Sequence, residues 1–232
     1  GEVVNFLKKE KPNLLILNSK AFSGNKVIEE SRRPYAVKSC YEKNENDEFL
    51  VDLAGYLTYV GCICVKRELW IKYFDETKIG TFFAHIKCLA EIKVGNKVHY
   101  FSQPAIKMRL GNQTWTNKSF LIWHKLYPEI IWGLEKYSKS AKEKIIVRNP
   151  LNSFKTMLAS RAYGRLQYQD YKKNILSSKN INIKNKVLIF LLLQFNSKII
   201  TNIYIYYILI FKKDHSNNFS PKLALFQLRE RL

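Results

Sequence analysis

Several short motifs that mark enzymes and cofactor sites are missing from this 232-residue chain. It has no phosphate-binding GxxxxGK[S/T] loop, no GxGxxG, no HExxH and no GxSxG. Its four cysteines form no CxxC pair, and its four histidines are neither spaced i,i+4 nor placed beside a cysteine. We therefore expect no zinc site in this chain.

A secretory signal peptide is also lacking, since no basic, apolar and small-residue segments follow Gly1 in order. The first residues read instead as a helix end that leads into a buried strand. From this we expect the sequence to be part of a longer protein. Cys62 and Cys64 alternate with apolar neighbours, as small core residues of a protein in a reducing compartment do.

Acidic residues are scarce in the second part of the chain. Residues 1–135 hold 20 Lys/Arg and 15 Asp/Glu, a net charge of +5, whereas residues 136–232 hold 19 and 4, a net charge of +15. A Lys-, Asn- and Ile-rich composition of the kind an AT-rich genome gives would explain the total, but it does not explain the asymmetry. The asymmetry indicates an anionic partner for the second part, either nucleic acid or a lipid surface.

Hydrophobic periodicity predicts an α/β region followed by helices. Glu2–Glu10 is a helix that Pro12 ends, and Leu14–Leu17 is a short buried strand. Further along, we expect these elements: a possible edge strand at 35–38, a helix at 47–56, a strand-like segment at 59–66, helices at 67–73 and 80–91, and strands at 98–101 and 105–110. From Thr116 the expected helices are 117–135, 139–146, 150–175 and 183–195. The predicted fold class is thus α/β with a helical carboxy-terminal region.

The apolar tail, Val187–Phe211, has the length of a membrane span but is interrupted at its middle by Gln194, Asn196, Ser197 and Lys198. A lysine at mid-bilayer costs roughly 2.5–3.5 kcal/mol. Two helices, 187–195 and 199–211, that meet at this polar elbow fit the pattern better. Basic flanks and several tyrosines indicate a peripheral anchor on an anionic membrane. A pair of buried core helices and a true span are the alternatives.

Four segments, in their order and spacing, give the chain a resemblance to a known family. They are Asn13–Asn18, the run Tyr59–Val60–Gly61 to Lys66–Arg67–Glu68–Leu69–Trp70, Gly80–His85, and Arg109–Asn112 with Trp115 following. Over residues 1–175 this order resembles the abequosyltransferase-like branch of the family 2 glycosyltransferases. The resemblance implies a partial GT-A domain at 1–115 and a helical extension at 116–180. The basic, apolar tail predicts membrane-associating helices at 181–232.

The resemblance also implies functional residues. His85 or Asp75 would act as catalytic base, because the stretch Thr77–Thr81, where many members carry a Glu-Asp pair, has no carboxylate. Residues expected to bind acceptor or donor are Gly61, Lys66, Arg67, Thr81, Arg109, Asn112 and Trp115. For several of these a structural role is the alternative: a core histidine at 85, a loop carboxylate at 75, a solvated arginine at 109 and a core tryptophan at 115.

The Asp-x-Asp segment with which family members bind a divalent metal, Mg or Mn, and a nucleotide-sugar donor is absent from this chain. By resemblance it would lie upstream, so the chain alone is expected to be inactive. The complete enzyme would move a sugar to a lipid-linked or saccharide acceptor for surface polysaccharide, at the cytoplasmic face of the bacterial inner membrane. The competing hypothesis is a non-catalytic basic protein that binds a membrane or nucleic acid. No nucleic-acid module is evident, and we expect no such partner.

Overall fold

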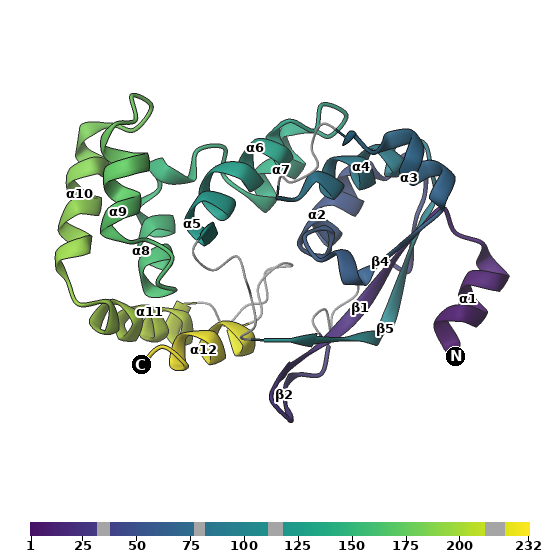
Figure 1. Ribbon diagram of the computed structural model, residues 1–232, viewed down its shortest axis with the longest axis horizontal. Coiled ribbons are helices and arrows are strands. Elements are labelled where there is room, and N and C mark those ends of the chain that lie inside the picture. Colours follow the sequence, from purple (N-terminus) through teal and green to yellow (C-terminus); the bar gives the residue numbers. More distant parts are fainter. Residues whose placement is uncertain (32–37, 77–81, 111–117, 212–220) are drawn as a thin grey trace. The chain divides into compact units, whose positions relative to one another are not determined.

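The computed structural model describes residues 1–31, 38–76, 82–110, 118–211 and 221–232, and its contacts divide the chain into two units (Figure 1). Unit 1 comprises Gly1–Asn112 and Ile130–Ile145, and unit 2 comprises Gln113–Glu129 and Ile146–Leu232. The chain is mixed α/β with helices at its carboxy-terminal end, as predicted. This division differs from the expected one at 130–145, which packs with the α/β part.

The sheet of unit 1 is built around β1 (Leu14–Ser23). Strand β5 (Val98–Arg109) runs parallel to it. On the other side of β1, β4 (Ile63–Val65) pairs antiparallel with its first residues and β2 (Lys26–Glu29) pairs antiparallel with its last. Strand β3 (Cys40–Tyr41) pairs with the start of β5. Residues 14–17 of β1 are buried, as a strand covered on both faces requires.

Helices cover both faces of this sheet. α2 (Asn46–Leu57) and α4 (Ala84–Lys93) lie on one face, and α1 (Glu2–Glu10) lies on the other (Figure 1). Because side chains alternate along a strand, Tyr100 of β5 meets Tyr56 of α2, while His99 meets the ring of Phe6 from α1. α3 (Arg67–Tyr73) and α7 (Lys139–Ile145) complete the unit.

Three predictions for unit 1 were wrong in extent. β1 continues six residues beyond Leu17 and turns at Gly24 (φ 55°) into β2, a hairpin that the polar composition concealed. The two strands expected around Gln103 and Pro104 are one strand, β5, with an irregular register opposite Asn18, because proline has no N–H for the ladder. The segment 59–66 is a 3₁₀ turn (η1, Val60–Cys62) followed by the short β4. Residues 35–37, 80 and 81 lie outside the described part.

Unit 2 is helical, with short π-helical turns. Its described elements are α5 (Ser119–Leu121), the π-helix η4 (Ile122–Leu126), η5 (Pro150–Asn152), α8 (Phe154–Ala162), α9 (Tyr168–Asp170), the π-helix η6 (Tyr171–Leu176), α10 (Ile183–Gln194), α11 (Ser197–Phe211) and α12 (Pro221–Arg229); α6 (Tyr127–Trp132) joins the two units along the chain. The core of unit 2 includes Met157, Leu166, Ile189, Ile208 and Leu228.

One expected helix of unit 2 is interrupted and two are confirmed. The segment 150–175 breaks after α8 at Gly164, whose φ of 65° does not continue a helix. The helices expected at 183–195 and 199–211 are present as α10 and α11, and Asn182 caps α10 through its side chain. Among the described helices none alone has the length and apolar character to cross a bilayer, whereas α10 and α11 meet that test together as a pair bent by 109°.

Candidate functional site

His85 lies in the first turn of α4 and is held by the end of α2. Its Nε2 is 2.7 Å from the carbonyl oxygen of Leu57. A carbonyl only accepts hydrogen bonds, so Nε2 carries the ring proton and Nδ1 keeps a free lone pair. Burial lowers the pKa of this half-buried imidazole below its usual 6.5. His85 is therefore neutral at physiological pH, with Nδ1 able to accept a proton.

Phe83, at the start of α4, has an unusual backbone conformation. Its φ is 63°, a left-handed value that is rare and costly for a residue with a Cβ. The Phe83 ring meets the His85 ring edge to face, with 6.2 Å between the centroids. Strained backbone of this kind is common where a structure fixes a functional side chain, which favours a role for this helix start.

A buried polar network centred on Asn18 of β1 lies beside the His85 contact. The Asn18 amide donates to the carbonyl of Ser102 and to the Ser31 hydroxyl, both at 2.7 Å, and its oxygen accepts from the Tyr56 hydroxyl. Leu57, the residue after Tyr56, is the one that holds His85. The network thus ties β1 and β5 to α2, the helix whose last residue holds His85. Sequence reasoning missed it, although an Asn directly after a buried apolar run was the available signal.

Gly61 lies in η1, four residues beyond the carbonyl that holds His85. A Cβ added there would lie 3.1 Å from the ring of Tyr59, a tight contact that the ring would have to relieve by a small shift. Glycine at this position lets the half-exposed Tyr59 ring fold over the backbone. Of the predicted binding residues that the structure describes, Gly61 is the one nearest in sequence to the Leu57 carbonyl that holds His85.

Lys66 and Arg67 lie at the other end of α4 from His85. The Lys66 amide donates to the carbonyl of Asn13, whose side chain bonds Asn96 just after α4 ends. His85 is in the first turn of that helix, so at 1.5 Å per residue ~12 Å separate the two ends. Both cationic side chains are exposed. They are not positioned to act on the atom that His85 would deprotonate.

Arg109 lies at a third place, at the carboxyl end of β5. Its Cα partner on β1 is Phe22, whereas Leu14 at the start of β1 pairs with Val65, next to Lys66. Eight residues of strand span roughly 25 Å. Arg109 and the Lys66–Arg67 pair therefore cannot hold the same diphosphate. The exposed guanidinium of Arg109 lies at the carboxyl edge of the parallel strands, as does Lys107, whose ammonium lies over the Phe22 ring.

The remaining predicted residues are either exposed or outside the description. Asp75 is exposed, two residues after the end of α3. Thr81, Asn112 and Trp115 lie outside the described residues. Asp75 remains an alternative base.

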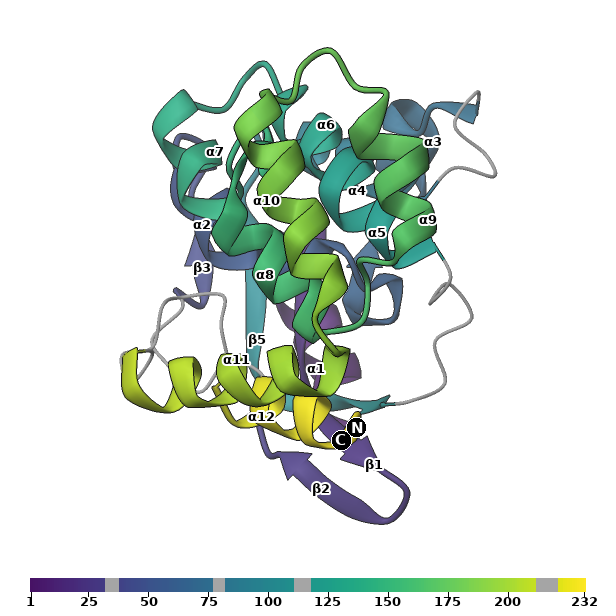
Figure 2. The same ribbon diagram turned by 90° about the vertical axis from the view of Figure 1, so that its left-hand side faces the viewer.

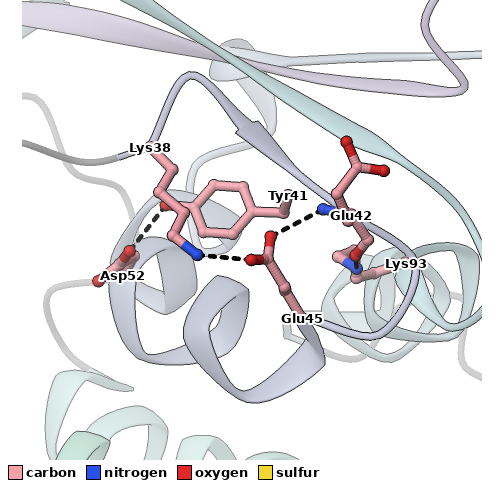
Figure 3. Close-up of polar contacts among 6 residues, drawn as sticks. All are labelled: Lys38, Tyr41, Glu42, Glu45, Asp52 and Lys93. Atoms are coloured by element: carbon pink, nitrogen blue, oxygen red, sulfur yellow. Dashed lines mark hydrogen bonds and ion pairs between the residues drawn. The ribbon is translucent and has the colours of Figure 1, made fainter.

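Other ionisable groups of unit 1 hold the start of α2 in place (Figure 3). Glu45 accepts from the Lys38 ammonium at 2.6 Å, and the buried Lys93 ammonium donates to the carbonyl of Glu42 at 2.6 Å. Asp52 accepts from the Tyr41 hydroxyl at 2.8 Å. Desolvation lowers the pKa of Lys93. These contacts are structural, and within the described part of the chain no three His, Cys, Asp or Glu side chains are grouped so as to bind a metal.

Unit 1 has an open cavity of ~580 Å³ on the face of the sheet that carries α1, away from His85. It is lined by Gly1, Glu2, Val3, Val4, Lys20, Phe101, Gln103, Pro104 and Ala105. Phe101 of this lining also packs edge to face on Phe6 of α1. The cavity therefore does not belong to the His85 site.

Unit 2 has a cavity of ~540 Å³ between its π-helices. Its lining includes Lys125, Glu129, Arg148 and Lys173, together with apolar and amide side chains. His124 of η4 also lines it and is enclosed: its Nε2 is 2.7 Å from the Ser160 hydroxyl, and burial, aided by the positive charge of Arg165, lowers its pKa to about 4. π-Helical turns often occur at functional sites. The His124 ring, however, is bonded within the core.

Comparisons of the chain with protein-family models, with curated proteins and with solved structures found no match. The chemistry of the site therefore follows from its own geometry. That geometry offers one neutral, oriented imidazole at a helix start, supported by a buried polar network and a strained backbone.

Proposed function

We propose that this chain is the acceptor side of a family 2 glycosyltransferase of GT-A type, with His85 as its catalytic base. The observation that supports this most is the hydrogen bond from His85 Nε2 to Leu57, which leaves a neutral Nδ1 to accept a proton. An inverting transfer requires such a base, because the acceptor hydroxyl must lose its proton as its oxygen bonds the anomeric carbon.

In the proposed reaction, the bond from the anomeric carbon to the nucleotide diphosphate breaks as the new glycosidic bond forms. The hydroxyl proton passes to Nδ1 of His85, and the diphosphate leaves with the bonding electron pair. A cation must stabilise that leaving group, and the resemblance is what assigns Arg109 to donor or acceptor binding. In the complete enzyme, a divalent metal held by an Asp-x-Asp segment upstream would supply further positive charge.

The proposed acceptor is a lipid-linked or saccharide glycan of the cell surface, and the proposed location is the cytoplasmic face of a bacterial inner membrane. A second candidate is a non-catalytic basic protein that binds a membrane or nucleic acid. The charge of unit 2 favours it, since that unit holds 17 Lys/Arg and 4 Asp/Glu, a net charge of +13. The two candidate functions differ in one respect that can be tested: only the glycosyltransferase requires the His85 side chain for its activity.

The test is sugar transfer by the chain joined to its upstream sequence. In His85→Gln, the new amide can still donate to the carbonyl of Leu57 but offers no base of similar basicity. We expect this variant to fold and to lose ~10²–10⁴-fold in kcat. The wild-type rate should fall as the pH drops through a midpoint below 6.5, because protonated His85 cannot accept a proton.

His99→Gln is the matched control, since His99 is another partly buried histidine of unit 1 that packs on Phe6, and it should leave kcat within about threefold. Asp75→Asn tests the alternative base. If the His85→Gln enzyme kept the wild-type rate and the Asp75→Asn enzyme were inactive, Asp75 would be the catalytic base. If both variants kept full activity, the site would not be catalytic.

A further inference from the structure

The side of α11 that faces away from the core of unit 2 carries a continuous apolar stripe. Ile199, Ile203, Tyr206 and Ile210 follow each other at spacings of four, three and four residues, and each is more than half exposed. The opposite side of the same helix, which includes Ile200, Tyr204 and Ile208, is buried in the core of unit 2. α11 is therefore apolar on both sides, and one side has no covering within the described chain.

α10 repeats this arrangement. Ile189 and Leu192 pack into the core of unit 2, whereas Ile183, Val187 and Leu191 are exposed at i, i+4 and i+8. The exposed fraction of Ile183 is 79%. α10 and α11 meet at 109° and lie along one side of unit 2 (Figure 2). Between them, residues 183–210 expose ten large apolar side chains: Ile183, Val187, Phe190, Leu191, Phe195, Ile199, Ile203, Tyr206, Leu209 and Ile210.

The charges on the segment that forms this surface are positive. Residues 171–211 contain six lysines and no Asp or Glu. Lys172, Lys173 and Lys184 are exposed, the first two on η6, which packs against α10. Protein–protein interfaces are usually depleted of lysine. Anionic lipid headgroups, in contrast, attract each nearby lysine by about 1 kcal/mol.

We propose that α10 and α11 bind in the plane of an anionic lipid bilayer, with the exposed stripe among the acyl chains and the lysines at the headgroups. The inference does not depend on the transfer chemistry proposed for unit 1. Residues 183–210 place ten exposed large apolar side chains on two consecutive helices, and clustered exposed apolar side chains mark interaction surfaces. Tyr206 within the stripe suits the boundary between headgroups and acyl chains.

The same geometry argues against a span. At 1.5 Å per residue the 12 residues of α10 and the 15 of α11 are ~18 and ~22 Å long, shorter than the ~30 Å hydrocarbon core. A span would also have to withdraw Ile189, Ile200 and Tyr204 from the core of unit 2. Binding in the interface keeps that core intact.

The experiment is co-sedimentation of the 232-residue chain with vesicles of phosphatidylcholine, with and without phosphatidylglycerol. We expect strong binding to the mixed vesicles and weak binding to phosphatidylcholine alone. The double variant Ile199→Ser/Ile203→Ser should bind mixed vesicles about tenfold or more weakly. Ile71→Ser is the matched control: it makes the same change at an isoleucine of α3 that is 65% exposed, and it should bind as wild type does.

The charge arm uses Lys172→Gln/Lys173→Gln/Lys184→Gln, which should reduce binding to mixed vesicles at least tenfold while leaving phosphatidylcholine binding unchanged. Far-UV circular dichroism and thermal unfolding check that each variant folds, and since the substituted side chains are exposed, both should match wild type. Full binding by the folded Ile199→Ser/Ile203→Ser variant would overturn the proposal.

Two further outcomes would also overturn it. If size-exclusion chromatography showed a dimer that the same double variant dissolves, the stripe would be an interface between copies of the chain. If bound protein resisted extraction by alkaline carbonate, α10 and α11 would cross the bilayer. Release of the protein by carbonate would support interfacial binding.

Discussion

His85 and His124 show how one residue type can serve two roles in the same chain. Both imidazoles bond through Nε2, and burial lowers the pKa of both. His85 meets a carbonyl, which fixes its tautomer, and it stays half-exposed at a helix start. His124 meets a hydroxyl, which can donate or accept, and it is enclosed beside the ring of Phe120. The first arrangement suits proton transfer, and the second suits structure.

The enclosed His124 makes the stability of unit 2 depend on pH. Its pKa is about 4 in the folded chain and about 6.5 when unfolded, so the unfolded state binds the proton more readily. The contribution of neutral His124 to the free energy of unfolding is fully present above pH 6.5, and it is lost as the pH falls towards 4. It amounts to about 3 kcal/mol at most.

Urea unfolding at several pH values between 7.5 and 4 would measure this loss. His124→Gln keeps a partner for Ser160 and removes the titration. We expect its free energy of unfolding to change less over this range than that of wild type. Equal pH dependence of the two proteins would show that His124 is not the group responsible.

The sequence could indicate these residues but not their contacts. His85 was a candidate base because of its place in Gly80–His85, and Arg109 was a candidate binding residue because of its place in Arg109–Asn112. The hydrogen bond that orients His85 joins residues 28 positions apart, and the separation of Arg109 from Lys66 depends on how three strands pair. Such facts follow from tertiary packing, which no local pattern encodes.

At the scale of elements, the left-handed backbone of Gly164 determines where α8 ends. Gly164 has a φ of 65°, and a Cβ added there would lie 1.8 Å from the guanidinium of Arg231. Gly164→Ala should therefore lower the free energy of unfolding by ~1–2 kcal/mol for the left-handed backbone, plus the cost of displacing Arg231.

Gly24→Ala is a control with a φ of 55° and open space around the added Cβ. The difference between the two alanine variants in urea unfolding isolates the contact with Arg231. Equal destabilisation of the two would show that Arg231 moves aside without cost.

Helix prediction succeeded where periodicity and end signals agreed. α1, α3, α7 and α10 lie within a residue or two of their predicted bounds, because caps and terminal residues such as Asn182 mark them locally. The segment 150–175 failed since its apolar spacing is helical on both sides of Gly164, and one glycine is a weak stop signal. β5 was divided at Pro104 because a proline usually ends a strand, yet an irregular register accommodates it.

At the scale of the whole molecule, the charge of +20 is shared unequally between the units. Unit 1 holds 22 Lys/Arg and 15 Asp/Glu, a net charge of +7, and unit 2 has +13. The more basic unit is also the one with the exposed apolar stripe on α10 and α11. Charge beside an exposed aliphatic surface is typical of proteins that bind anionic membranes, whereas a basic patch alone is the usual mark of nucleic-acid binding.

A salt titration separates these two uses of the same charge. Binding to duplex DNA depends on released counterions, so its logarithm falls linearly with the logarithm of the salt concentration, without a floor. Binding to mixed vesicles should fall at first, as the lysines are screened, and then level off at a floor, an affinity set by the apolar stripe, which salt does not weaken.

We expect the 232-residue chain to show this floor in its affinity for vesicles. The Ile199→Ser/Ile203→Ser variant should lose the floor and keep the initial slope, because its lysines are unchanged. A chain that bound DNA more tightly than vesicles at physiological salt, with no floor on either, would instead be a nucleic-acid-binding protein.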